Sequence, residues 1–358
     1  MASLVRGYGK YLAKRIIIMA TTLIIATYLT VIIANMGGLV DEIVKSQIEI
    51  EVSESMREDP KLAEMTKEEK EEYKQEMIAL RLRARGLDKP FVMRSFYYLR
   101  DALTLNLGRA MFLRSASGSN RISTIILERL PWSILLYTTG TIINIIIGLP
   151  LGLYMGRRAL SKLDRGVSMF AVLTASLPSW FIGVLFILLF YFYLGWFPPG
   201  GLVSTTHASY WSLGAVRDIA WHIALPLMAW VITGFGGWAY TTRNMVIHIT
   251  HEDYVLAARA KGVPEGLLVR RYILRPAAPP IVTMVALSLI ASWSGAIITE
   301  TVFGWPGLGT LFWGAVSNMD APVVIGLTVI YAYLLVITIF ALNIIYGLLD
   351  PRVKTGAR

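Results

Sequence analysis

Six long apolar stretches run along the chain, separated by segments rich in charged or turn-forming residues. Each has about 20 residues or more with few or no charges, the length that an α-helix needs to cross a hydrocarbon core of about 30 Å. Backbone groups inside a bilayer must be hydrogen-bonded within their own segment, so helices are the expected structure. The predicted spans are residues 15–36, 131–155, 167–194, 220–242, 278–299 and 321–347.

The first apolar stretch also has the basic flank of a secretory signal peptide. Its apolar core, Ile16–Ala34, is longer than the usual core of about 7–15 residues, and no small-x-small cleavage pattern follows it. We therefore expect a retained span with its N-terminus in the cytoplasm.

Residues 37–129 form the longest polar segment, with sixteen acidic and sixteen basic residues. Within it, Thr66 and Glu69 have the spacing of a capping box, in which each residue satisfies a free amide of the other. The pattern predicts a helix over about 66–85 that stops at Gly86. A structural lid and a docking platform for an extracytoplasmic partner both remain open as roles for this segment.

The charge pattern predicts how the chain is oriented. The composition is 55% hydrophobic and 16% charged, with a net charge of +10. Basic residues gather before the first span, in loops 156–166 and 243–276, and in the C-terminal tail, whereas loops 195–219 and 300–320 have almost none. This positive-inside pattern places both termini in the cytoplasm. The positive charge therefore reflects orientation in the cell (plasma) membrane, and no nucleic-acid partner is expected.

Several catalytic and metal-binding classes find no support in the residues. The chain has no cysteine, which excludes disulfides, thiolate nucleophiles and cysteine metal sites. His248 and His251 have helical spacing, but no third ligand is near in the sequence, so we interpret them as polar residues at the membrane edge. Zinc-protease, serine-nucleophile and Walker motifs are missing, which disfavours an intramembrane enzyme and ATP hydrolysis by this chain alone.

A short basic segment lies between the fourth and fifth spans, at residues 253–276. Asp253–Lys261 has the length of two helical turns, and Gly262 is placed to end that helix in a left-handed conformation. Pro264 fits the first position of a second helix, over about 264–275, because that position needs no amide donor.

Two interpretations of this helix pair account for its basic residues. One is an amphipathic hairpin held by anionic lipid. The other is a short helix docked in a groove of a soluble partner. The small surface expected from Ala257, Ala258 and Ala260, together with the glycine and proline between the helices, favours docking.

Nine motifs occur along nearly the whole chain in a particular order. They are GLDKPF (86–91) with LNLG (105–108), LERLPWS (127–133), IGLPLGL (147–153), LDRG (163–166), SLPSWFIG (176–183), LGWFPPGG (194–201), DYVLAARAKG (253–262), ETVFGWPGLG (300–309) and LLDPR (348–352). In this order they resemble the permeases of the dipeptide/oligopeptide subfamily of ABC importers. The chain departs from the pattern at Leu256, where the wider family has glutamate, and at Leu274–Arg275, which is followed by Pro276.

The resemblance implies an all-α polytopic membrane protein with six transmembrane helices, in the type I ABC-importer permease fold. A mainly helical extracytoplasmic insertion would lie between the first two spans. The implied regions are a cytoplasmic N-terminus and first span (1–36), an extracytoplasmic region (37–129), a five-helix permease core (130–349) with a coupling loop (244–276), and a cytoplasmic tail (350–358).

The resemblance also implies partners and a site. It implies no catalytic site and no cofactor in this chain, because two cytoplasmic ATPases would bind ATP and Mg. A homologous second permease would complete a heterodimer, and an extracytoplasmic solute-binding protein would deliver the solute. The residues expected to couple to the ATPase are Asp253, Tyr254, Ala257, Ala258, Arg259, Ala260, Lys261 and Gly262.

The solute pathway is less well defined by the sequence. Its candidate residues are Pro178, Trp293, Ser294, Glu300 and Phe303. Three of them also have a structural interpretation: Pro178 as a packing kink, Trp293 as a lipid-facing ring, and Glu300 as an interfacial carboxylate that caps the following turn.

The resemblance favours a di- or oligopeptide as the solute. An oligosaccharide is a close second, since tryptophans stack on sugars, and nickel is disfavoured because no ligand cluster lines a span. A secondary, ion-coupled transporter is the alternative function. The scarcity of ionisable residues inside the spans speaks against it.

Overall fold

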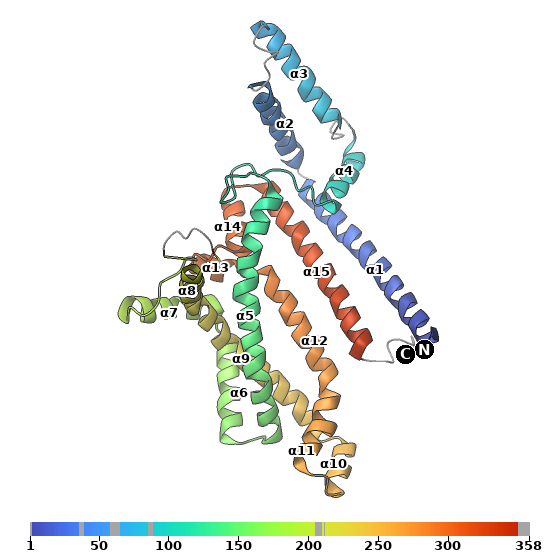
Figure 1. Cartoon of the computed structure of the whole chain (residues 1–358), viewed down its shortest axis with the longest axis vertical. Helices are drawn as coiled ribbons and strands as arrows, with labels where there is room; N and C mark the ends of the chain where they lie inside the picture. Colours follow the sequence, from blue (N-terminus) through green and yellow to red (C-terminus); the bar gives the residue numbers. More distant parts are fainter. Residues whose placement is uncertain are drawn as a thin grey trace. The chain divides into compact units, whose positions relative to one another are not determined.

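The chain is built almost entirely of helices. The computed structural model describes residues 2–35, 39–57, 65–84, 89–204, 210 and 212–349 (Figure 1). In these ranges the only β-structure is one isolated antiparallel bridge, between Arg109 and Arg121. The expected all-α architecture is thus confirmed. The helices form two compact units: residues 1–128 with 314–358, called unit 1, and residues 129–313, called unit 2.

Each of the six predicted spans has a helical counterpart. Four single helices are long and apolar enough to cross a membrane: Ala13–Ile33, Ile122–Arg157, Glu265–Leu289 and Ala321–Ala341. Two further spans are pairs of helices that meet at a bend, so the number reaches six when each pair is taken as one span.

The third span is broken where the sequence places a proline. Helices Lys162–Ala175 and Ser179–Tyr193 meet at 96°, and Pro178 stands directly before the second of them in an extended conformation. Proline has no amide hydrogen to continue a helix, and its ring blocks the preceding turn. The predicted break at Pro178 is confirmed.

Unit 1 contains the first and last spans and the polar insertion between them. Helices α1 and α15 run side by side, and α2 and α3 form a hairpin with Ile48, Val52 and Ile78 at its centre (Figure 1). Its helices are α1 (Ala2–Asn35), α2 (Leu39–Arg57), α3 (Lys67–Ala84), α4 (Phe91–Leu103), the start of α5 (Ile122–Arg157), the end of α14 (Leu308–Ser317) and α15 (Ala321–Leu349).

Helix α3 begins with the predicted capping box. The Thr66 amide donates to Glu69 Oε2 at 2.8 Å, and the Glu69 amide donates to Thr66 Oγ1 at 3.4 Å. The bonds that the Glu69 carboxylate accepts from the amide and the hydroxyl of Thr66 hold the pKa of Glu69 below its usual range, because they favour the charged form. The predicted helix is confirmed, and its predicted stop at Gly86 lies outside the described residues.

Unit 2 holds the rest of the chain. Helix α6 lies along α9, and the turn between α5 and α6 lies at the same end of the unit as α10 and α11 (Figure 1). Its helices are most of α5, α6 (Lys162–Ala175), α7 (Ser179–Phe186) with a π-helical extension (Ile187–Tyr193), α8 (Leu213–His222), α9 (Ala224–Thr250), α10 (Asp253–Ala260), α11 (Glu265–Leu267) with a π-helical extension (Leu268–Leu274), α12 (Arg275–Ala291), α13 (Ile297–Val302) and most of α14.

A ridge of glycines on α5 allows α9 to approach closely. Gly148, Gly152 and Gly156 are four residues apart and therefore lie on one helical face. A Cβ added at Gly152 would lie 2.3 Å from the carbonyl oxygen of Ala239, and one at Gly148 would lie 2.4 Å from Trp238 Cβ. Small residues at this spacing are a common way to pack membrane helices.

Candidate functional site

The segment between α9 and α12 forms a tight helical elbow. Helix α9 ends at Thr250, and α10 follows after a turn of two residues. The elbow itself is Gly262, whose φ of +73° is the left-handed conformation that glycine adopts without strain. The Val263 amide donates to Ala258 O at 3.2 Å, and the Gly262 amide donates to Arg259 O at 3.0 Å. This is a Schellman ending, and it confirms the predicted role of Gly262 as a helix stop.

The second helix of the pair differs from its prediction at both ends. Pro264 lies one residue before the helix, at its N-cap, with an extended ψ of 138°. The helix then continues from Glu265 through a π-helical stretch into α12 without a break. The predicted end of this helix near residue 275 is therefore wrong. One continuous helix joins the basic segment after Gly262 to the fifth span.

Helix α10 has one buried side and one exposed side. Val255 and Ala258 pack against Leu268, with Ile249, Val263 and Tyr272 around them. Ala258 therefore does not contribute to an exposed alanine surface, which corrects the sequence prediction: it lies on the inward face, three residues after Val255. The outward face carries Asp253, Ala257 and Ala260. Tyr254 and Leu256, which are 43% and 47% exposed, are two residues apart and lie on opposite flanks of the helix.

The other predicted coupling residues lie on or beside this outward face. Ala257, Ala260 and Lys261 are exposed, as is Asp253 in the first turn. Arg259 is exposed too, and its guanidinium lies 3.6 Å from Glu265. Burial raises the pKa of the Tyr254 hydroxyl above its ordinary value, with a smaller contribution from the charge of Glu252, so the phenol is neutral at physiological pH.

Glu265 connects the elbow to another span. Its carboxylate lies 3.6 Å from Arg259 on α10 and 3.8 Å from Arg157 at the end of α5. All three side chains are substantially exposed, so each pair contributes about 0–1 kcal/mol. The contacts therefore favour one arrangement of the elbow beside α5 without locking it.

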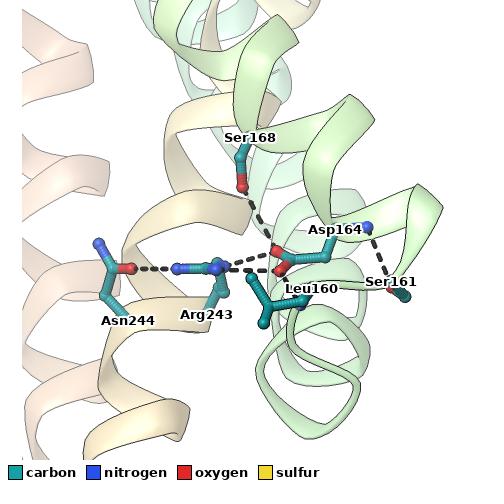
Figure 2. A network of polar contacts seen from close by, with 6 residues as sticks. All are labelled: Leu160, Ser161, Asp164, Ser168, Arg243 and Asn244. Carbon is teal, nitrogen blue, oxygen red and sulfur yellow. Dashed lines mark hydrogen bonds and ion pairs between the residues drawn. The ribbon is translucent and has the colours of Figure 1, made fainter.

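A stronger polar contact, absent from the predicted site, joins α6 to α9 (Figure 2). Asp164 is 1% exposed, and Arg243 reaches it with two nitrogens, Nε at 2.5 Å from Oδ1 and Nη2 at 2.9 Å from Oδ2. The Leu160 amide also donates to Oδ2 at 2.8 Å, and the Ser168 hydroxyl donates to Oδ1 at 3.4 Å. A bidentate arginine–carboxylate pair fixes geometry as well as charge.

The sequence held a weak signal for this pair. Asp164 is the single acidic residue among four basic ones in loop 156–166, and Arg243 follows directly after an apolar span. Nothing in the sequence shows that the two side chains meet across 79 positions. The pair matters for the site because α9 leads directly into α10.

The predicted pathway residues lie in two places. Pro178 heads α7, and the neighbouring Ser179 hydroxyl lies 3.2 Å from that of Thr299 in α13. Phe303, at the end of α13, is buried against Leu225 and Ala229. Trp293 is half-buried in a short 3-10 turn before Gly295, and the side chain of Ser294 lies outside the described part.

Glu300 is buried in unit 2, where it holds the turn after α13. Its Oε1 accepts from Ser133 Oγ at 2.7 Å, and its Oε2 accepts from the Thr310 amide at 3.0 Å. Ser133 Oγ in turn accepts from the Leu308 amide at 2.8 Å. The carboxylate therefore caps the turn, as the structural interpretation of Glu300 expected, and it also ties the turn to α5 through Ser133.

Comparison with known proteins identifies the family. Residues 148–355 match the family of binding-protein-dependent transport system inner membrane components. This chain belongs to that family. It is a permease subunit of an ABC importer and a multi-pass membrane protein, with the type I permease fold expected from the sequence. Permeases of this family are non-catalytic, and the family implies partner ATPases and a binding protein.

Several relatives are similar over most of their length. The oligopeptide transport system permease protein AppB of Bacillus subtilis (strain 168) is 29% identical over 75% of this chain and 82% of its own. The dipeptide transport system permease protein DppB of the same organism is 28% identical, over 75% and 81%. The inner membrane ABC transporter permease protein YejB of Escherichia coli O157:H7 is 32% identical, over 79% and 77%.

A solved structure of the MetNI methionine ABC transporter, in inward-facing conformations, is also similar to this chain. It is 20% identical, and the match covers 67% of this chain and 100% of that chain, with a TM-score of 0.44. In the described residues of this permease, no group of three or more histidine and acidic side chains is placed to hold a metal ion.

Proposed function

We propose that this permease carries di- or oligopeptides and receives the motion of its ATPase through α10. The observation that carries the coupling role is the packing of α10, which is buried on one side at Val255 and Ala258 and exposed on the other at Ala257 and Ala260, with Tyr254 and Leu256 on its two flanks. A short helix with small residues on its exposed face and an apolar side chain on each flank fits a groove on a soluble partner. The names of AppB and DppB support a peptide as the solute.

The connections of α10 give the coupling a mechanical basis. Helix α9 leads into it through two residues, and the helix after the Gly262 elbow continues unbroken into α12. A force on α10 would therefore act on two spans at once. The Asp164–Arg243 pair extends the same connection to α6, because it fastens α6 to the part of α9 that precedes α10.

Basic segments at one end of unit 2 support the proposed orientation in the membrane, and with it the proposed partners. The basic α5–α6 turn and the α10 elbow lie at one end (Figure 1), and a cytoplasmic location for this end agrees with the positive-inside rule. Both termini would then be cytoplasmic and residues 37–129 extracytoplasmic, with residues 130–349 as the permease core. Two ATPases, a homologous second permease and a solute-binding protein complete the proposed importer.

Cross-linking from single cysteines tests the coupling role, because the natural chain has none. Ala257→Cys and Ala260→Cys place a thiol on the exposed face, and Ala258→Cys places one on the buried face as a matched control. Each variant is assembled with the ATPase subunits and treated with a photoreactive maleimide. We expect adducts with the ATPase from positions 257 and 260 and none from 258. Absence of adducts at both exposed positions would overturn the docking of α10.

Uptake by the reconstituted importer tests the solute and the energy source separately. Labelled peptides of two to five residues and labelled oligosaccharides are supplied with the binding protein, ATP and Mg. We expect peptide accumulation that needs ATP and persists when a protonophore collapses the proton gradient. Accumulation of oligosaccharide alone would reject the peptide proposal and leave coupling intact. Uptake that stops with the protonophore while ATP remains would support an ion-coupled transporter instead.

A further inference from the structure

Hydrogen bonds connect helix α4 to both long spans of unit 1, α1 and α15. The hydroxyls of Tyr28 on α1 and Ser95 on α4 lie 3.0 Å apart. At the other end of α4, Tyr333 of α15 donates its hydroxyl to Leu103 O at 2.8 Å. Ala102 packs between them in a buried cluster with Val31 and Val329. The position of α4 along α1 and α15 is therefore fixed.

A second face of α4 is apolar and uncovered by described residues. Val92 is 63% exposed, and Met93 and Phe96 are each 57% exposed. Positions 92, 93 and 96 share one side of a helix, beside the buried face of Ser95 and Leu99. The stripe is thus a property of the folded helix and not a set of scattered surface residues.

This stripe continues the exposed apolar surface of α1. The Phe96 ring stacks on that of Tyr28, with centroids 5.4 Å apart and planes at 24°. Around Tyr28, the α1 span exposes Ile25, Leu29 and Ile33. These three side chains belong to a helix whose length and composition place it in a bilayer. Whatever surrounds these three side chains in the bilayer is therefore expected to contact Phe96 as well.

The position of the Tyr28–Phe96 contact along the α1 span agrees with a location at the membrane–water interface. Tyr28 lies five residues before the end of the α1 span at Ile33, which corresponds to about 7.5 Å along the helix axis. Interfacial helices bury their apolar face by about 5–10 Å. The other side of α4 is polar, with Arg94, Tyr97 and Asp101. Arg100 follows Phe96 by four residues and so ends the apolar face, but its guanidinium turns to the polar side, 3.1 Å from Asp101 and over the Tyr97 ring.

We propose that α4 lies in the membrane–water interface at the α3 side of the α1 span, with Val92, Met93 and Phe96 inserted among lipid acyl chains. Helix α4, bound to lipid in this way, then serves as a structural connection within unit 1. It joins α1 and α15 and holds the α2–α3 hairpin of unit 1 at the membrane surface. This role does not depend on the solute or on α10.

Depth-dependent fluorescence quenching tests the proposal in the assembled importer. Met93→Cys and Phe96→Cys carry an environment-sensitive fluorophore, in vesicles containing lipid with a nitroxide either near the headgroup or at the middle of the acyl chain. Leu80→Cys on α3 is the matched control, because Leu80 is equally apolar and 60% exposed but lies on the charged hairpin. Ile24→Cys, one residue from the middle of the α1 span and 43% exposed, is the positive control.

The expected result is loss of fluorescence at positions 93 and 96, stronger with the nitroxide near the headgroup, and no loss at 80. At position 24, near the middle of the span, the order of the two quenchers should be reversed. Unquenched fluorophores at both 93 and 96 would overturn the proposal. Quenching at these positions in the isolated chain but not in the assembled importer would also overturn it, since the second permease would then be the cover.

Discussion

At the scale of single residues, Asp164 occupies the most constrained polar position in unit 2. Its carboxylate is buried, and Arg243, Leu160 and Ser168 together use both of its oxygens. Removing one partner of a buried pair leaves the other charge uncompensated, which costs about 3–5 kcal/mol. The loss is larger than the pair's own contribution to stability, because desolvation of the remaining charge is not repaid.

We therefore expect Asp164→Asn to lower the midpoint of thermal unfolding in detergent, by the equivalent of about 3 kcal/mol since Arg243 retains some exposure. Asp101→Asn is the control, because Asp101 pairs with Arg100 at the surface, where a pair contributes about 0–1 kcal/mol. Equal midpoints for the two variants would show that the α6–α9 contact does not depend on this charge pair.

Gly262 allows a second test at this scale, because its constraint is conformational and not steric. A Cβ there would meet nothing within 4 Å, but φ is +73°. The left-handed conformation costs an L-residue about 1–2 kcal/mol, and a β-branched residue is a true outlier there. In Gly262→Val we expect the protein to insert, the basal ATPase activity of the importer to persist, and uptake to fall.

The control for this prediction lies four residues along the chain. Gly266 also has open space around it, without a left-handed φ. Gly266→Val should therefore keep its transport, because valine has a somewhat higher helix propensity than glycine and its side chain meets open space. Full uptake by Gly262→Val, measured as peptide accumulated for each ATP hydrolysed, would remove the elbow from the coupling mechanism.

At the scale of elements, the α5–α9 pair depends on the absence of side chains. A Cβ at Gly152 would lie 2.3 Å from the Ala239 carbonyl oxygen, a backbone atom that cannot move independently. We expect Gly152→Val to separate the two helices and to reduce the yield of folded protein, measured by size-exclusion chromatography. Gly237→Val is a matched control within α9, because nothing lies within 4 Å of its Cβ position. Similar yields for both variants would contradict the glycine ridge.

Elements whose structure depends mainly on their own local sequence were predicted well. The six spans and the helix after Thr66 follow from local length, charge and capping, and Pro178 and Gly262 act through their own backbones. Helix α4 was not predicted, because it lies within the charge-dense segment 37–129, although its apolar residues gather on one broad side of the helix. The inward position of Ala258 could not be predicted either, since a short helix shows its buried side only when its partner, here Leu268, is known.

The same limit separates the predicted site from the observed one. The coupling segment could be located by its charge, glycine and proline, and by a resemblance spread over nine motifs. The contacts that support it could not, because Asp164–Arg243 and Glu300–Ser133 join positions 79 and 167 residues apart. The sequence by itself gives no distance between positions so far apart. Which charged side chains are buried is known only from the folded structure.

At the scale of the whole molecule, the proposals about coupling and about partners both require one orientation in the membrane. Six crossings and a basic face on one side predict that α10 is cytoplasmic and that Leu213, at the start of the bent fourth span, lies on the opposite side. Since the natural chain has no cysteine, Lys261→Cys and Leu213→Cys each introduce a single exposed thiol. A membrane-impermeant maleimide added to intact cells or spheroplasts should label position 213 at once and position 261 only after permeabilisation. Each variant is the control for the other, because both thiols are exposed and differ only in the side they face. Labelling of position 261 from outside would place α10 away from any ATPase and end the coupling proposal, whatever solute the importer carries.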